Sequence, residues 1–402
     1  MKKKLLPALI VTGLIILVVI IMGITALINK YTPTKKTEDL KEYFNISSDD
    51  EAALIVDNEL SDYKAKIIDK KIYVDYKFVH DSLNSRFYWD ANENVLLYTT
   101  ASDIISAAAD SNSYSVTKQT NDFGYPIVKA TSDSALIALD YVKQYSNITF
   151  KSYDDPARIV ITSKWDEIDS ATVSKSTQVR VKGGIKSPIL KEVKKDDKIT
   201  ILDSGDKWDK VATEDGVIGY IKRKALSESK KTKLTNPDYE EETFTHIKKD
   251  KDICLAWNQV TSQSANSKVP QVISSTKGIN VMSPTWFYLN DNNGNLADIA
   301  SKDYVSYCHS QGIEVWGLFS NFENTDVDAA YVLTHTSTRT TLINQIMSAA
   351  FNYELDGVNI DFENITEAAY GDSYIEFIRE LAIKCHLSLI HISEPTRLGM
   401  IS

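Results

Sequence analysis

The chain has 402 residues, of which 43% are hydrophobic, 25% charged and 10% aromatic, a composition that excludes a wholly disordered or collagen-like protein. The formal net charge is −10, from 55 acidic and 45 basic residues, and no basic domain stands out. We therefore expect no nucleic-acid partner. Three cysteines cannot build a disulfide framework, and the six histidines form no ligand motif, so we predict no metal and no cofactor.

The N-terminus carries a basic cluster followed by a long apolar run. Lys2, Lys3 and Lys4 precede Leu5–Ile28, which contains no charged residue and exceeds the roughly 20 residues that a membrane-spanning helix needs. Residues 1–29 are predicted to be a signal anchor with a cytoplasmic N-terminus, because lysines favour that side. The alternative is a cleaved secretory signal, although no convincing cleavage site follows.

A polar linker over residues 30–50 leads to a mixed module over residues 51–165. Strands are predicted at Asn94–Thr100 and Ala157–Thr162, and Lys71–Val79 alternates like a strand that runs into a helix. Ser134–Lys143 has helical spacing. This region resembles the copper amine oxidase N-terminal-like α+β domain, which implies no metal here.

Residues 172–228 have the pattern of a small all-β barrel, and residues 229–244 form a polar linker. Short β-prone runs alternate with Gly, Asp and Lys turns, and strands at this spacing are typical of barrels. The runs are Gln178–Lys182, Lys198–Leu202, Trp208–Ala212 and Gly216–Lys222. They resemble bacterial SH3 domains. Trp208 and Tyr220 fit a core as well as a ligand site, so no site is assigned there.

From residue 245 to residue 386, apolar strands alternate with helical patterns. The predicted strands are Asp252–Trp257, Gly278–Leu289, Ile313–Phe319 and Leu355–Glu363, and the predicted helices are Asn295–Gln311, Ser337–Glu354 and Tyr370–His386. Such alternation indicates βα units and a parallel sheet. A complete eight-unit barrel takes about 250 residues. The expected fold is therefore an α/β TIM barrel truncated after about four βα units, within a multidomain chain.

The candidate catalytic residues lie in the last of these strands. Side chains alternate along a strand, so Asn359, Asp361 and Glu363 share one face, while the apolar residues between them face the outer helices. Asp361 and Glu363 are expected roughly 6–7 Å apart at their β-carbons. Catalytic residues of these barrels lie at the carboxyl ends of strands, and two close carboxyls suit glycosidic bond cleavage.

The segment Asp356–Glu363 resembles the signature of glycoside hydrolase family 18, DGxDxDxE. Two further segments, Ser283–Tyr288 and Val315–Asn321, resemble the spore-cortex N-acetylglucosaminidase branch. The resemblance implies that Glu363 is the general acid/base and that Asp361 orients the 2-acetamido group of the substrate, whose oxygen is the nucleophile.

Four other positions complete the predicted site. Asn359 stands where the family has its middle Asp. This difference removes a charge beside Asp361 and can shift the pH optimum of the activity. Asp356 has the opposite strand parity and is expected to support the start of the strand. Three aromatic residues at or near strand ends are candidate walls for sugar stacking, with barrel packing as the alternative: Trp257, Trp286 and Trp316.

The C-terminal segment has a different character. Residues 387–402 resemble the translation of a sequencing-library adapter rather than any protein family, and we expect them to be an artefact that interrupts the barrel. A genuine short tail is the alternative.

Together these features predict a monomeric, membrane-anchored bacterial enzyme whose ectodomain cleaves β-linked N-acetylglucosamine glycans, peptidoglycan or a chitin-like polymer, at the cell wall. The alternative is a non-catalytic glycan-binding or wall-scaffolding protein on the same fold. Retention of Glu363 favours the enzyme. A third possibility is an interaction module built on the N-terminal domains, because half a barrel leaves unpaired sheet edges.

Overall fold

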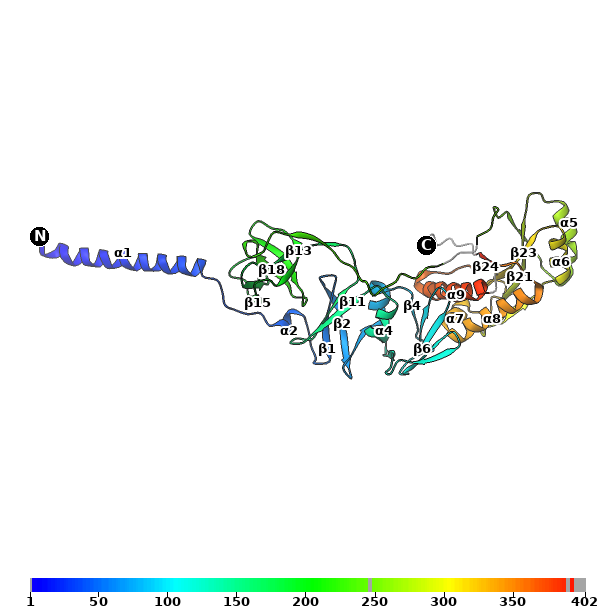
Figure 1. Ribbon diagram of the computed structural model, residues 1–402, viewed down its shortest axis with the longest axis horizontal. Coiled ribbons are helices and arrows are strands. Elements are labelled where there is room, and N and C mark those ends of the chain that lie inside the picture. Colours follow the sequence, from blue (N-terminus) through cyan, green and yellow to red (C-terminus); the bar gives the residue numbers. More distant parts are fainter. Residues whose placement is uncertain (1, 245–247, 388–390, 394–402) are drawn as a thin grey trace. The chain divides into compact units, whose positions relative to one another are not determined.

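The computed structural model describes residues 2–244, 248–387 and 391–393. It divides into two compact units: residues 1–73 with 145–239, and residues 74–144 with 240–402 (Figure 1). The division passes through the region 51–165 that the sequence analysis treats as one module. The boundaries of the predicted modules, and their resemblance to SH3 and amine oxidase domains, remain predictions.

The first unit begins with the apolar helix α1 (Lys2–Tyr31). Its segment Ile10–Tyr31 is long and apolar enough to cross a membrane, a test that a signal sequence also passes. A short helix, α2 (Leu40–Tyr43), follows, and Asp39 caps it by accepting a hydrogen bond from the backbone N–H of Lys41 at 2.8 Å.

Two sheets make up the rest of the first unit. Strands in the order β11-β12-β1-β2-β3 form one, with β1 and β12 parallel, and seven antiparallel strands in the order β15-β14-β18-β17-β16-β13-β19 form the other. The first five are β1 (Glu51–Val56), β2 (Glu59–Ile68), β3 (Lys71–Asp75), β11 (Thr149–Tyr153) and β12 (Arg158–Thr162). The antiparallel strands are β13 (Glu167–Thr172), β14 (Thr177–Arg180), β15 (Ile189–Val193), β16 (Lys198–Asp203), β17 (Trp208–Thr213), β18 (Ile218–Lys222) and β19 (Lys230–Lys233), with a turn of helix, η2 (Arg223–Ala225), after β18.

These two sheets share one hydrophobic core. Phe44, Ile55 and Val217 are all fully buried in it. Gly216 lies at the turn between β17 and β18 with φ +83°, and a Cβ there would come within 2.8 Å of Val160 on β12. Only glycine combines this backbone conformation with so close an approach. The two sheets of the first unit therefore pack as one body.

The second unit contains a parallel sheet in the order β20-β21-β23-β24-β25, with β22 antiparallel at the end of β21. Its strands are β20 (Leu255–Asn258), β21 (Val281–Leu289), β22 (Leu296–Asp298), β23 (Glu314–Ser320), β24 (Gly357–Asp361) and β25 (His391–Ser393). Its helices are η3 (Gln263–Lys268), α5 (Val269–Ser274), α6 (Lys302–Ser310), α7 (Ala329–Thr334), α8 (Thr336–Tyr353) and α9 (Glu367–Leu387). The four predicted strands are thus present. The strand β25 falls within the segment attributed to an adapter.

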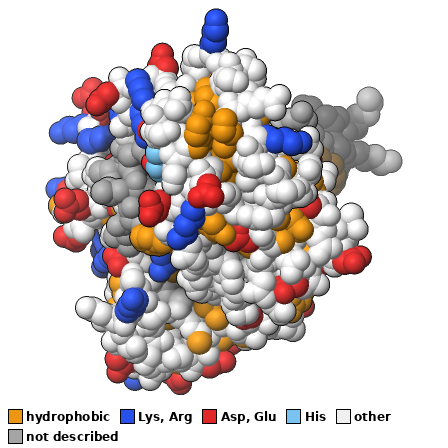
Figure 2. All heavy atoms as spheres, turned by 90° about the vertical axis from the view of Figure 1, so that its right-hand side faces the viewer, with side chains coloured by type: hydrophobic (Ala, Val, Ile, Leu, Met, Phe, Trp, Pro, Cys, Tyr) orange, Lys and Arg blue, Asp and Glu red, His pale blue; other side chains and the backbone are white. Residues whose placement is uncertain are grey.

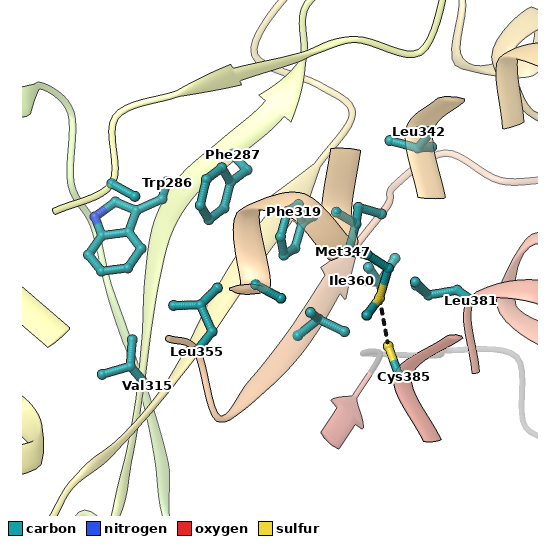
Figure 3. Close-up of a cluster of buried hydrophobic side chains, with 14 of the residues drawn as sticks. Trp286, Phe287, Val315, Phe319, Leu342, Met347, Leu355, Ile360, Leu381 and Cys385 are labelled. Atoms are coloured by element: carbon teal, nitrogen blue, oxygen red, sulfur yellow. Dashed lines mark hydrogen bonds between the residues drawn. The ribbon is translucent and has the colours of Figure 1, made fainter. Parts of the chain in front are cut away.

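Apolar side chains fill the space between this sheet and its helices (Figure 3). Phe287 of β21 stacks on Phe319 of β23 with ring centroids 4.6 Å apart. On the helix side, the sulfur atoms of Met347 and Cys385 lie 3.8 Å apart. Gly312, with φ +69°, follows the C-terminal end of α6, where a glycine in the left-handed conformation commonly ends a helix.

The second unit also contains a five-stranded antiparallel meander, β4 to β8. Its strands are β4 (Phe87–Asp90), β5 (Val95–Thr99), β6 (Ile104–Ala108), β7 (Ser113–Val116) and β8 (Gln119–Asp122). Around them lie α3 (Tyr76–Phe78), η1 (Val79–Leu83), β9 (Val128–Ala130), β10 (Ala135–Ala138) and α4 (Leu139–Gln144). The helix predicted over Ser134–Lys143 is wrong in its first half, because Ala135–Ile137 pairs with β9 as a strand.

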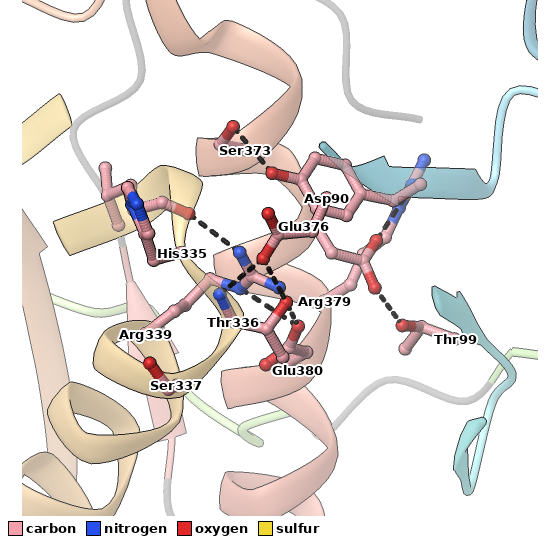
Figure 4. Close-up of polar contacts among 12 residues, drawn as sticks. Asp90, Thr99, His335, Thr336, Ser337, Arg339, Ser373, Glu376, Arg379 and Glu380 are labelled. Carbon is pink, nitrogen blue, oxygen red and sulfur yellow. Dashed lines mark hydrogen bonds and ion pairs between the residues drawn. The ribbon is translucent and has the colours of Figure 1, made fainter. Parts of the chain in front are cut away.

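The meander contacts α8 and α9 through polar side chains (Figure 4). Asp90 accepts hydrogen bonds from the backbone N–H and the hydroxyl of Thr336, each at 2.6 Å. Glu93 accepts from the N–H of Ser337 at 3.0 Å. Both donors lie in the first turn of α8, whose own N-cap residue, His335, makes no side-chain cap. The meander therefore supplies the caps that this helix lacks.

Arg339 is the buried centre of this contact. It is fully buried and donates to Glu380 at 3.0 Å and to the carbonyl oxygen of Leu333 at 2.7 Å. Its guanidinium lies 5.0 Å from the centroid of the Tyr88 ring on β4. Burial raises the pKa of Glu380 above its ordinary value, and the charge of Arg339 opposes that increase.

Replacement of Arg339 by methionine should lower the free energy of unfolding of the second unit by about 3–5 kcal/mol, because Glu380 then stays buried without its partner. Urea denaturation of the detergent-solubilised chain, followed by near-ultraviolet circular dichroism, measures the loss. The control is Lys129→Met, which breaks the 3.7 Å pair with the exposed Asp110 and should cost about 0–1 kcal/mol. Equal losses for the two variants would contradict the role assigned to Arg339.

Candidate active site

The strand β24 separates apolar from polar side chains as its alternation predicts. Val358 and Ile360 are fully buried in the core that the helices cover. Phe362, just beyond the strand, stacks on Phe377 of α9 with centroids 5.6 Å apart. On the opposite face, Asn359 is buried and donates from Nδ2 to the hydroxyl of Ser283 on β21 at 3.0 Å. Asn359 thus ties two strands together below Asp361.

Glu363 is exposed and lies two residues past the carboxyl end of β24. Its backbone is held from the neighbouring strand, because Asn321 follows β23 and forms two hydrogen bonds with it. The N–H of Glu363 donates to Oδ1 of Asn321 at 2.8 Å, and Nδ2 of Asn321 donates to the carbonyl oxygen of Glu363 at 3.0 Å. The position of the carboxylate is therefore set at its backbone while its side chain faces solvent.

Asp361 is the last residue of β24 and is half-buried. Burial, together with the nearby charges of Glu363 and Glu323, raises the pKa of Asp361 above its ordinary value. Burial disfavours the charged form of a carboxyl, and like charges disfavour it further. The half-buried Asp361 and the exposed Glu363 therefore lie at the same edge of the sheet.

Glu323 is a site residue that sequence reasoning missed. It accepts a hydrogen bond at 2.5 Å from the hydroxyl of Ser320, the last residue of β23, and Ser320 pairs in register with Asp361. The available signal was its place four residues after the predicted strand Ile313–Phe319, at the edge where catalytic groups gather.

A β-bulge in β21 changes which residues face this edge. Thr285 pairs with Leu318 and Phe287 with Phe319, so β21 has one extra residue there. After the bulge, Tyr288 pairs with Ser320 and so faces the same side of the sheet as Ser320 and Asp361. Sequence reasoning did not select Tyr288, because strict alternation cannot reveal a bulge.

The three candidate tryptophans lie in different environments. Trp286 is fully buried, with its Nε1 donating to Asn266 at 2.8 Å, and Trp316 is 2% exposed with its Nε1 3.1 Å from Glu314. A wall for sugar stacking needs an accessible ring face, so the structure places these two side chains in packing positions. Trp257 is 63% exposed and pairs in register with Ser283. It remains a candidate for stacking.

Asp356 lies before the first residue of β24, at the end of the strand opposite Asp361. Its Oδ2 accepts from the backbone N–H of Val315 and lies 2.8 Å from Nε2 of His309, and its own N–H donates to the carbonyl of Val315. These contacts tie the start of β24 to β23 and α6. Across residues 2–244, 248–387 and 391–393, no group of three His, Cys, Asp or Glu side chains is arranged to hold a metal ion.

Three solved structures illustrate what the chain is similar to. A chitinase from Chromobacterium violaceum is 16% identical over 35% of this chain and 44% of its own, with a TM-score of 0.30. A class V chitinase from Pseudomonas fluorescens has the same identity and coverage, with a TM-score of 0.31. The spore cortex-lytic enzyme SleL from Bacillus megaterium is 16% identical over 42% of both chains, also at 0.31.

This chain thus spans less than half the length of each of these proteins. No protein-family profile matches it, and no curated protein matches it. What the candidate site can do follows from its own side chains.

Replacement of Glu323 by glutamine should lower the pKa of Asp361, because one of the negative charges that disfavour its ionised form disappears while its burial stays the same. Carboxyl carbon NMR of the aspartate side chains, followed as a function of pH, measures the shift. The control is Glu354→Gln, which removes an exposed carboxylate at the C-terminal end of α8. A pKa of Asp361 that is the same in both variants would contradict the proximity of Glu323.

Proposed function

We propose that this chain belongs to a glycoside hydrolase that cleaves β-linked N-acetylglucosamine glycans with retention of configuration. One observation carries the proposal. The half-buried Asp361 ends a parallel strand two residues before the exposed Glu363, so two carboxyls lie close together at the carboxyl edge of the sheet. The segment that holds them also resembles the family 18 signature, apart from Asn359.

In the proposed reaction, Glu363 is the general acid. Its proton moves to the glycosidic oxygen as the bond between that oxygen and C1 breaks, and the acetamido oxygen of the same sugar bonds to C1. Asp361 accepts a hydrogen bond from the acetamido N–H and stabilises the positive charge that develops there. Water then attacks C1 with Glu363 as the base, which restores the acetamido group and the acid. No metal or cofactor takes part.

Peptidoglycan is the proposed substrate, with a chitin-like polymer as a second choice. Anchoring by α1 would hold the ectodomain, as a monomer, outside the membrane of a bacterium and beside its wall. The SH3-like and amine oxidase N-terminal-like modules would be accessory domains of this enzyme.

The Glu363→Gln variant should release products from purified peptidoglycan or chitin oligomers at least about 100-fold more slowly than the unmodified chain, because the proton donor is lost. Reducing-end assays and mass spectrometry of soluble fragments measure the release. The exposed Glu354→Gln variant is the matched control and should keep full activity. Release that survives Glu363→Gln would contradict the assigned mechanism.

The second candidate is a glycan-binding or wall-scaffolding protein, and the exposure of Trp257 is the observation that favours it. No release by the unmodified chain, together with retention on peptidoglycan, would support this candidate.

Under either candidate, Trp257→Ala should weaken binding of N-acetylglucosamine oligomers about 10-fold, because aromatic faces stack on sugar rings. Isothermal titration calorimetry measures the affinity. The Phe351→Ala variant removes a similarly exposed ring, 65% accessible, from the helix α8 and should bind as the unmodified chain does. Unchanged affinity in Trp257→Ala would remove Trp257 from the site.

A further inference from the structure

The segment after the apolar helix α1, predicted as a linker, lies along a sheet of the first unit. The N–H of Thr34 donates to the carbonyl of Ile185, and the N–H of Glu38 to the carbonyl of Ile189, both at 2.8 Å. The N–H of Ile189 donates in return to the carbonyl of Lys36, also at 2.8 Å. The chain that leaves α1 is thus bound to the strand β15 and the loop before it.

Side chains strengthen this attachment. Lys186 donates from Nζ to the carbonyl oxygens of Asn29 and Thr32, the latter at 2.8 Å. Arg180 is 3% exposed and donates to the carbonyls of Thr34 at 3.2 Å and Ser187 at 2.6 Å. The loop 181–188 is therefore held within the length of one lysine side chain from the C-terminal end of α1.

The charged side chains around the end of α1 are all positive, although the chain as a whole has a net charge of −10. Residues 30–37 and 180–191 contain lysines and one arginine but no Asp or Glu. Among the described residues, no carboxylate forms an ion pair with the exposed members of this set, which we name the basic collar: Lys30, Lys35, Lys36, Lys182 and Lys186. Tyr31, 66% exposed, lies among them, as is typical of residues at a membrane interface.

We propose that the basic collar binds the anionic phospholipid headgroups of the bilayer that α1 spans. The proposal rests on the proposed anchoring. A helix that spans the bilayer brings its C-terminal end to the headgroups, and the contacts of Lys186 bring the loop to the same level. Attraction between lysines and anionic lipids acts only within about one Debye length, roughly 8–10 Å. A wall polymer carries the same charge but is not placed at this level by α1.

Lysine acetylation in nanodiscs tests the collar on the full chain. Discs of phosphatidylcholine are compared with discs that also contain phosphatidylglycerol, and mass spectrometry measures the acetylation rate of each lysine. Lys35, Lys36 and Lys182 should react several-fold more slowly in the anionic discs at low salt, and this protection should vanish in 0.5 M NaCl. The control lysines Lys230 and Lys233, exposed on β19, should react equally in both discs.

Variants add a second measurement. The double substitution K182E/K186E should reduce the protection of Lys35 and Lys36, whereas the matched K230E/K233E should leave it unchanged. Equal rates in both discs, for a chain that stays with the discs, would overturn the collar. A chain that separates from the discs on gel filtration would instead overturn the anchoring. Soluble polyglycerol phosphate can also be added to the phosphatidylcholine discs. If it protected Lys35, Lys36 and Lys182 as strongly as the anionic discs do, the assignment to lipid would be overturned.

Discussion

The second unit depends on one buried guanidinium. Arg339 extends from α8, binds Glu380 of α9 and the carbonyl at Leu333 of α7, and lies against the ring of Tyr88 on β4. These helices form the layer behind β23 and β24, which carry the candidate catalytic side chains. A charge so deeply buried is tolerated only while its partners are in place. It therefore makes the arrangement of three helices and one strand mutually dependent.

The meander contributes to the same dependence. Its carboxylates satisfy backbone donors at the start of α8, and Thr99 donates to the buried Glu376 of α9. Those helices in turn cover the apolar face of β24. The strands β4 to β8 therefore belong, energetically, with the parallel sheet, although more than 130 residues separate them along the chain. The shared core of the first unit is a second example, since Gly216 packs against β12.

The sequence predicted most where one local pattern decides the outcome. The four parallel strands follow from apolar runs between helical patterns. The two faces of β24 follow from alternation, which the place of Val358 and Ile360 in the helix-side core and the hydrogen bond of Asn359 to Ser283 confirm. The sequence predicted least where contacts with residues far along the chain decide the local structure. Ala135–Ile137 has helical spacing but pairs with β9, and the start of Asn295–Gln311 forms β22 against β21. Phe287 joins Trp286 on the helix side, and Tyr288 faces the side of Asp361, because a bulge in β21 shifts the alternation by one residue.

The contact between Asn321 and Glu363 has a consequence for how the site can change. The side chain of Asn321 forms two hydrogen bonds with the backbone of Glu363, as the backbone of a neighbouring strand would. The hydrogen bonding between β23 and β24 therefore continues past the last residue of β24 through a side chain. The backbone of Glu363 is consequently positioned by one amide group rather than by the packed core. A change confined to the short loop after β23 could redirect the carboxylate without disturbing a buried residue. The direction of this carboxylate and the stability of the fold can therefore change separately at this edge.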